Sequence, residues 1–301
     1  MDGRRHAVAV LQALLVTFLW STSWVLIKVG LEDLPPLVFA GLRYVLASLI
    51  LLLVLCRDPA RRRELRRLDG RSWRLFAALG LAMYSLTQGA QFVALGEISA
   101  VTVSLVLSAT PALVALLSIP LLDEPPSRLQ WLGIAVFFAG AWLYLGVAGI
   151  ARGEIFGLAV AIFGMAANGA AALLGRRVNR DPTSTALTVT AVSMTLGSVV
   201  LLIAGLAVEG MPALSLRSWL ILGWLSVVNT AFAFTLWNHT LRRLTATESS
   251  VINNTMLIQI AILAWIFLGE SLGGRQVVGV LVAAVGALLV QLRREPLRAA
   301  G

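Results

Sequence analysis

Two long stretches of this chain repeat each other at a fixed offset of 146 positions. The tripeptide Arg-Ser-Trp stands at 71–73 and again at 217–219. An internal repeat of this kind dictates the architecture, because both copies are expected to fold into the same elements. The other pairs at this offset are Leu95 and Leu241, Ala100 and Ala246, Ser104 and Ser250, Glu124 and Glu270, Gln130 and Gln276, Gly133 and Gly279, and Gly140-Ala141 and Gly286-Ala287.

The apolar character of the chain sets the second constraint. Of its 301 residues, 58% are hydrophobic and only 13% are charged, whereas a soluble domain has about 25% charged residues. A membrane span needs about 20 apolar residues, and ten such segments predict an all-α integral membrane protein with ten transmembrane helices. The predicted spans are 8–29, 36–56, 73–95, 99–121, 129–147, 154–175, 185–208, 217–240, 248–268 and 273–292.

The distribution of basic residues predicts the orientation. With both termini cytoplasmic, 19 of the 24 basic residues fall on the cytoplasmic side and three on the outer side, as the positive-inside rule requires. Each half, residues 1–147 and 148–295, then has five spans, so the second half enters the membrane upside down. We therefore predict an inverted-topology repeat, followed by a cytoplasmic tail at 296–301.

Several other functions are disfavoured by composition. The net charge of +9 could indicate nucleic-acid binding, but the arginines lie in short loops between apolar runs and are better explained by membrane orientation. Cys56 is the only cysteine, the only histidines are His6 and His239, and no carboxylate falls in the middle of a span. We therefore expect no metal, no cofactor and no enzymatic activity.

The chain resembles the EamA-type permeases of the drug/metabolite transporter superfamily. The resemblance rests on Phe-Leu-Trp-Ser-Thr-Ser-Trp-Val-Leu-Ile-Lys-Val-Gly at 18–30, on the segment 31–44 that follows, and on Glu124 and Glu270, each followed by a glutamine and spaced glycines. It implies a ten-helix carrier of small polar or amphipathic metabolites in the bacterial plasma membrane, often an exporter. It also implies a central cavity built by spans 1, 3, 4, 6, 8 and 9.

One position departs from the family pattern. The family commonly has a proline midway along both span 4 and span 9, but here Pro111 is matched by Leu257. Proline frees the carbonyl four residues earlier and kinks a helix. We therefore expect a kink in span 4 and none in span 9.

Polar and aromatic side chains that share a helix face within the spans are the candidate cavity residues. Amides and hydroxyls there could bind a polar group, and aromatic rings could bind an apolar or cationic part. The competing explanation is hydrogen bonding between helices. The candidates are Trp20, Ser21, Trp24, Tyr84, Gln88, Gln91, Asn168, Asn229, Trp237, Asn253 and Asn254.

Three ionisable groups lie within the predicted spans or near their ends. Arg43 lies inside span 2, where it could bind a substrate anion or extend its guanidinium to the outer surface. His239, near the inner end of span 8, could couple transport to protons. Lys28, near the outer end of span 1, is expected to pair with Glu32 or Asp33.

We interpret the chain as a carrier that works by alternating access on a small molecule such as an amino acid, an amine or an amphipathic compound. A channel-like facilitator is the main alternative, and a membrane-embedded enzyme is the other. The glycine faces of spans 5 and 10 suit close packing, either within one molecule or between the copies of a homodimer.

Overall fold

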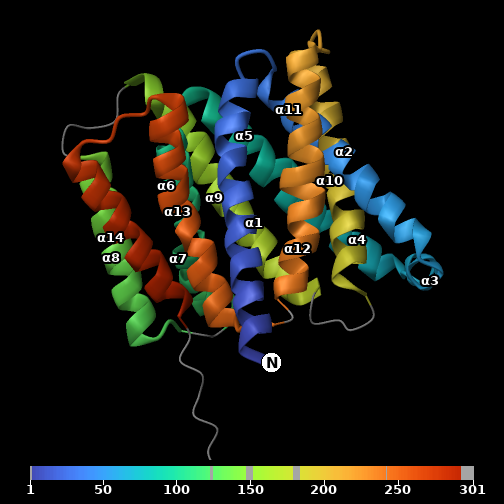
Figure 1. Ribbon diagram of the computed structural model, residues 1–301, viewed down its shortest axis with the longest axis horizontal. Helices are drawn as coiled ribbons and strands as arrows, with labels where there is room; N and C mark the ends of the chain where they lie inside the picture. Colours follow the sequence, from blue (N-terminus) through green and yellow to red (C-terminus); the bar gives the residue numbers. More distant parts are fainter. Residues whose placement is uncertain (1, 123–124, 147–151, 179–183, 242, 293–301) are drawn as a thin grey trace, which may run out of the picture.

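The computed structural model describes residues 2–122, 125–146, 152–178, 184–241 and 243–292, and every regular element in these ranges is helical. The helices stand side by side in one bundle, with α3 projecting from its edge (Figure 1). They are α1 (Asp2–Gly30), α2 (Pro36–Arg57), α3 (Pro59–Arg66), α4 (Gly70–Gly80), η1 (Leu81–Thr87), α5 (Gln88–Glu97), α6 (Ala100–Leu107), α7 (Thr110–Leu122), α8 (Arg128–Leu145), η2 (Arg152–Glu154), α9 (Ile155–Val178), α10 (Ala186–Glu209), α11 (Leu216–Ser226), η3 (Val227–Phe232), α12 (Ala233–Thr240), α13 (Ala246–Leu268) and α14 (Gly274–Gln291).

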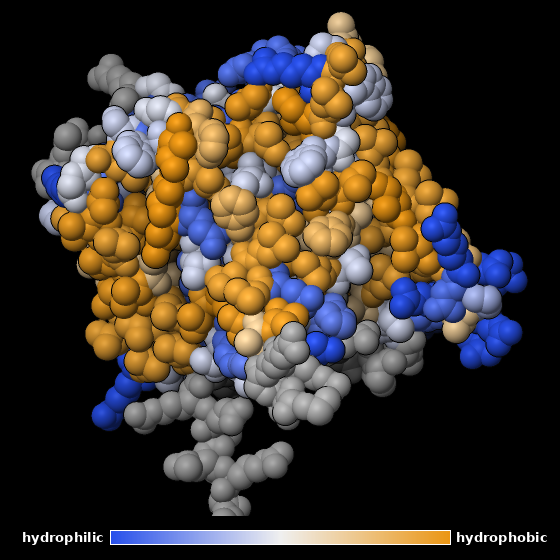
Figure 2. All heavy atoms as spheres, in the orientation of Figure 1, coloured by the Kyte–Doolittle hydropathy of each residue, from blue (hydrophilic) through white to orange (hydrophobic). Residues whose placement is uncertain are grey.

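Nine helices in the described ranges are long and apolar enough to cross a membrane. Each of the ten predicted spans overlaps helical segments of the described residues, but the third is not among the nine. This segment runs through α4, η1 and α5 and contains Gln88 and Gln91, whose amide side chains lower its hydropathy. The surface agrees with a membrane setting, because hydrophobic residues cover most of the middle of the face in Figure 2, and strongly hydrophilic ones lie at the upper end, along the lower edge and around α3.

The third and eighth predicted spans share an interruption. Each contains a short π-helical segment, η1 at Leu81–Thr87 and η3 at Val227–Phe232, and the two begin 146 residues apart. Helices α4 and α11, like α8 and α14, also begin and end at positions that differ by 146. The structure therefore keeps the offset of the sequence repeat from α4 onward. The π-helical segments were not predicted from the sequence.

The expected difference between spans 4 and 9 is confirmed. Span 4 is broken, with α6 ending at Leu107 and α7 beginning at Thr110, whereas α13 continues without a break through Leu257. Pro111 has no N–H to offer the Leu107 carbonyl. That carbonyl accepts instead from the Thr110 hydroxyl at 2.7 Å.

Glycines allow α8 and α14 to approach each other at backbone distance. A Cβ added to Gly133 would lie 2.7 Å from the Val290 nitrogen, and one added to Gly279 would lie 2.6 Å from the Tyr144 nitrogen. Along the contact, residue numbers increase on α8 while they decrease on α14, so the two helices are antiparallel. The two contacts are also images of each other under the offset of 146, and a second such pair joins Gly140 to Ala283 and Gly286 to Phe137. These glycine faces are therefore used within the monomer.

Carboxylates tie helix ends to distant loops. Glu270 accepts hydrogen bonds from the Ala100 and Val101 nitrogens at 2.7 and 3.3 Å, and so caps α6. At the same end of the bundle, Glu32 and Asp33 form salt bridges with Arg217 at 2.8 and 3.2 Å. The expected pairing of these carboxylates with Lys28 is wrong, because Arg217, far along the chain, forms salt bridges with both. Glu124 lies outside the described residues.

Candidate functional site

The polar face of α1 contacts α13 in the other half through Gln259. The Ser21 hydroxyl donates to Gln259 Oε1 at 2.9 Å, and Gln259 Nε2 donates to Thr17 Oγ1 at 3.3 Å and to Thr255 Oγ1 at 2.9 Å. Ser21 is fully buried and Gln259 partly so. Gln259 was not predicted, although it is an isolated amide in an apolar run four residues after Thr255.

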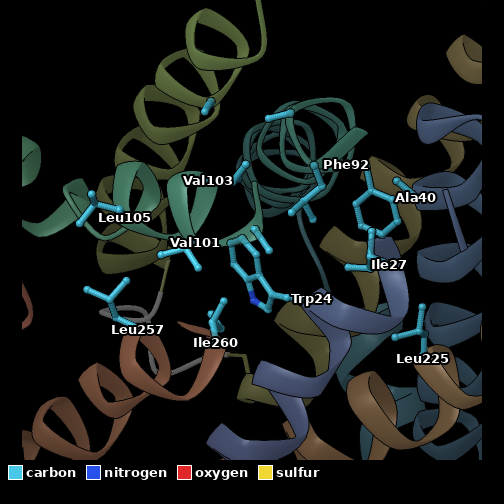
Figure 3. Close-up of a cluster of buried hydrophobic side chains, with 14 of the residues drawn as sticks. Trp24, Ile27, Ala40, Phe92, Val101, Val103, Leu105, Leu225, Leu257 and Ile260 are labelled. Carbon is cyan, nitrogen blue, oxygen red and sulfur yellow. The ribbon is translucent and has the colours of Figure 1, made fainter. Parts of the chain in front are cut away.

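Aromatic rings fill the space beside this contact. Trp20 lies 5.3 Å from both Phe234 and Trp237, measured between ring centroids, so it joins α1 to α12. Trp24, one turn further along α1, is 8% exposed and belongs to the main apolar core. Its indole lies beside Val101 and Ile260 in Figure 3. Trp24 therefore serves packing, while Trp20 and Trp237 form a partly exposed aromatic pair.

Arg43 is the centre of a second group of polar side chains, between α2, η1, α5 and η3. Its guanidinium is 4% exposed and reaches the Thr230 hydroxyl at 3.3 Å. It also lies 5.0 Å from the centroid of the Tyr44 ring and 5.9 Å from that of Phe92. No carboxylate in the described part of the chain forms a salt bridge with it. The buried cation is thus held by a hydroxyl and two aromatic faces.

Two of the three predicted residues on the α4–η1–α5 segment contact Tyr44, the neighbour of Arg43. The Tyr44 hydroxyl donates to Gln88 Oε1 at 2.7 Å, and the Tyr84 ring lies 5.6 Å from the Tyr44 ring. Gln91 follows on the same helical face, is 9% exposed, and makes no hydrogen bond through its side chain to the described residues. Tyr44 therefore contacts Tyr84, Gln88 and the Arg43 guanidinium, while the place of Gln91 in a substrate site stays a prediction.

Asn229 holds η3 against α1. Its amide donates to the Leu19 carbonyl and, at 3.2 Å, to Thr22 Oγ1. The residue is fully buried, and its Oδ1 has no hydrogen-bond partner. Both hydrogen bonds go to the neighbouring helix α1. They therefore favour interhelical bonding, the alternative to a cavity role for Asn229.

The remaining candidates are dispersed. Asn168 donates to Thr110 Oγ1 at 3.2 Å, at the break between α6 and α7. Asn254 donates to the Ser250 carbonyl and accepts from Gln291, so it faces α14. Asn253 is partly buried on α13, and His239 is exposed near the end of α12. The structure does not bring these four residues into one group.

The chemistry available between the helices is that of binding. Amides, hydroxyls, aromatic faces and one guanidinium lie among apolar spans, and the described residues contain no group of three or more His, Cys, Asp or Glu side chains that could hold a metal. A bundle of apolar helices with polar side chains between them is typical of a multi-pass membrane protein.

Comparison with known proteins narrows this class to a family. The sequence model of the EamA-like transporter family matches residues 7–146 and again 155–292, so the chain belongs to that family and is a membrane transporter.

Among similar proteins, the uncharacterized inner membrane transporter YedA of Escherichia coli K12 is 27% identical over 90% of this chain and 85% of its own length. The uncharacterized transporter YoaV of Bacillus subtilis is 24% identical over 91% of this chain and 93% of its own. A solved crystal structure, 19% identical, superposes with a TM-score of 0.66 over 94% of this chain and 97% of its own, which shows the shared fold.

Proposed function

We propose that the chain is a ten-span carrier of a small metabolite, built from two inverted five-helix halves, residues 1–147 and 148–295. The reciprocal contact of α8 with α14 carries this proposal. These helices are equivalent in the repeat, they run antiparallel, and each contact between them has its image under the offset of 146. Two halves related by a two-fold axis across the helices would produce such an arrangement, and inverted halves of this kind commonly alternate access to a site between them.

Repeat-related loops provide a direct test of the inversion. Ser127 and Gly273 are exposed, precede α8 and α14, and differ by 146. In a Cys56→Ala background, a cysteine at Ser127 is expected to react with an impermeant maleimide only from the cytoplasmic side, and one at Gly273 only from outside. Labelling of both from the same side would contradict the inverted repeat. The excess of arginine on one side supports cytoplasmic termini and a place in the bacterial plasma membrane.

Arg43 supports a substrate with a negatively charged group. A buried charge without an opposite charge is costly, and a bound carboxylate would supply one. The neighbouring amides and rings suit a polar and an apolar part, so an amino acid fits this group of residues better than an amine. The family resemblance favours export.

The two halves differ where they are expected to move. The break between α6 and α7 gives the first half a flexible point, whereas the equivalent helix α13 is continuous. The contact of Ser21 with Gln259 joins helices from different halves, so it has to change if the halves rock against each other. A homodimer would need a surface other than the glycine faces of α8 and α14.

Counterflow in proteoliposomes tests the carrier. Vesicles loaded with pooled amino acids, amines or other metabolites are placed in labelled pools, and exchange above that of empty vesicles is identified by mass spectrometry. We expect saturable exchange of one class, reduced in Gln88→Leu. Flux that neither saturates nor shows counterflow would favour the channel-like alternative. Absence of exchange by folded protein with any pool would contradict the proposal.

A further inference from the structure

A cavity of about 920 Å³ lies away from the group around Arg43, at the end of the bundle where α3 projects. It is bounded by α3, α4, the end of α9 and the residues just before α10. Four arginines line it, namely Arg63, Arg67, Arg71 and Arg177. Its size suits a small organic anion, since ligand sites commonly measure about 300–1,000 Å³.

The two carboxylates of this cavity are already engaged. Glu64 accepts from the Thr185 nitrogen at 2.5 Å and from its hydroxyl at 3.2 Å, and so caps α10. Asp69 accepts from the Ser72 nitrogen at 2.8 Å and caps α4. Hydrogen bonds from the Ser72 side chain and backbone hold the pKa of Asp69 below its usual value. Both carboxylates are therefore used to cap helix ends.

None of the four arginines forms a salt bridge in the described part of the chain, although Arg71 interacts electrostatically with Asp69. The four arginines outnumber the two carboxylates that line the same cavity. Guanidinium groups bind phosphate oxygens through paired N–H donors, so several arginines around one cavity favour a phosphate group over a single negative charge.

The inner part of the cavity is apolar. Phe76 and Val178 line it, each 3% exposed, together with Leu68 and Leu75. The hydrophilic residues around α3 adjoin the hydrophobic surface of the bundle in Figure 2. An arginine-lined opening above an apolar wall matches a molecule with a phosphate at one end and a hydrocarbon chain at the other, at the depth of lipid head groups.

We propose that this cavity binds a phosphate-bearing anion between Arg63, Arg67, Arg71 and Arg177. The phosphate could belong to the head group of an anionic phospholipid or to a soluble phosphate compound, and the apolar wall favours the lipid. The inference is independent of the transport proposal, because it concerns other residues and only requires the protein to lie in a membrane.

Binding is measured by native mass spectrometry of the full chain in detergent, titrated with phosphatidylglycerol, with zwitterionic phosphatidylcholine, or with inorganic phosphate. The test variant carries Arg67→Gln and Arg71→Gln. The matched control carries Arg62→Gln and Arg66→Gln, which removes the same charge from exposed positions that do not line this cavity. We expect phosphatidylglycerol to bind about tenfold more weakly to the test variant and within about twofold of wild type to the control.

The source of the phosphate follows from the three titrations. Preference for phosphatidylglycerol over phosphatidylcholine, with no competition from inorganic phosphate, identifies a lipid. Equal binding of the two lipids, with inorganic phosphate lost in the test variant, identifies a soluble compound. Equal weakening in test and control would overturn the proposal, since diffuse charge would then explain the affinity, and so would absence of anion binding. Arg177→Gln, on a different helix, is expected to weaken binding about threefold if the double variant unfolds.

Discussion

The side-chain amide of Asn168 donates a hydrogen bond to the Thr110 hydroxyl, 3.2 Å away, at the point where the fourth span breaks. The same hydroxyl donates to the Leu107 carbonyl at 2.7 Å, which is the carbonyl that Pro111 leaves without an N–H. The Thr110 hydroxyl thus bonds across the break between α6 and α7 and also joins this segment to α9. The second half has no such arrangement, because Leu257 replaces the proline and α13 is continuous.

Thr110→Val should therefore destabilise the protein, because it leaves both the Leu107 carbonyl and the Asn168 amide without this partner. An unsatisfied buried polar group costs about 1–3 kcal/mol. Thr110→Ser retains the hydroxyl and is expected to behave as wild type. Thermal unfolding in detergent measures both variants. Equal melting temperatures for the valine and serine variants would show that the hydroxyl does not stabilise the break.

Gln88→Leu and Asn229→Leu should differ in stability although both are expected to slow transport. Asn229 is fully buried and makes two hydrogen bonds to α1, so its replacement should cost about 1–2 kcal/mol of unfolding free energy. Gln88 is only partly buried and accepts one bond from Tyr44, so its replacement should cost less than about 1 kcal/mol. Chemical unfolding in detergent, together with counterflow, separates the effects. A Gln88→Leu protein that transports at the wild-type rate would remove Gln88 from the site.

Arg43→Gln and Arg43→Lys distinguish a substrate-binding charge from a structural one. If Arg43 binds a substrate carboxylate, the glutamine variant should lose affinity by about tenfold or more, while lysine should retain part of it because the charge remains. Competition in counterflow between an amino acid and its carboxyl amide provides the readout. We expect wild type to prefer the acid and Arg43→Gln to lose that preference. If the wild-type protein binds the amino acid and its carboxyl amide equally, Arg43 does not bind the substrate carboxylate.

Much of this fold could be predicted from the sequence because hydrophobic span length and the repeat are strong signals. The break at Pro111, the capping box of Thr245 with Glu248, and the small faces of spans 5 and 10 also follow from local rules, and all are present. The contact of both Tyr84 and Gln88 with Tyr44 agrees with their spacing, because residues four apart share a helix face.

The rest depended on contacts between distant segments. Lys28 is close to Glu32 in sequence, but Arg217 reaches that carboxylate because the fold brings the start of α11 beside it. Neither hydropathy nor spacing indicates a π-helical turn, so η1 and η3 were not predicted. Asn229 has a polar amide side chain within a span, which suits a cavity as well as a helix contact. Only its hydrogen bonds to α1 show that it joins helices.

The contact of α8 with α14 yields the sharpest test of packing. A methyl group at Gly286 would collide with the backbone of Phe137, which cannot move without separating the helices. Gly286→Ala should therefore destabilise the protein by about 1–3 kcal/mol, the usual cost of overpacking. Gly223→Ala is the matched control, because a methyl group there meets nothing within 4 Å and alanine favours a helix by about 0.5–1 kcal/mol. The melting temperature should be lower than that of wild type for Gly286→Ala, and equal to it or higher for Gly223→Ala. If Gly286→Ala is as stable as Gly223→Ala, α8 and α14 do not meet at backbone distance, and the reciprocal contact that supports the inverted repeat is lost.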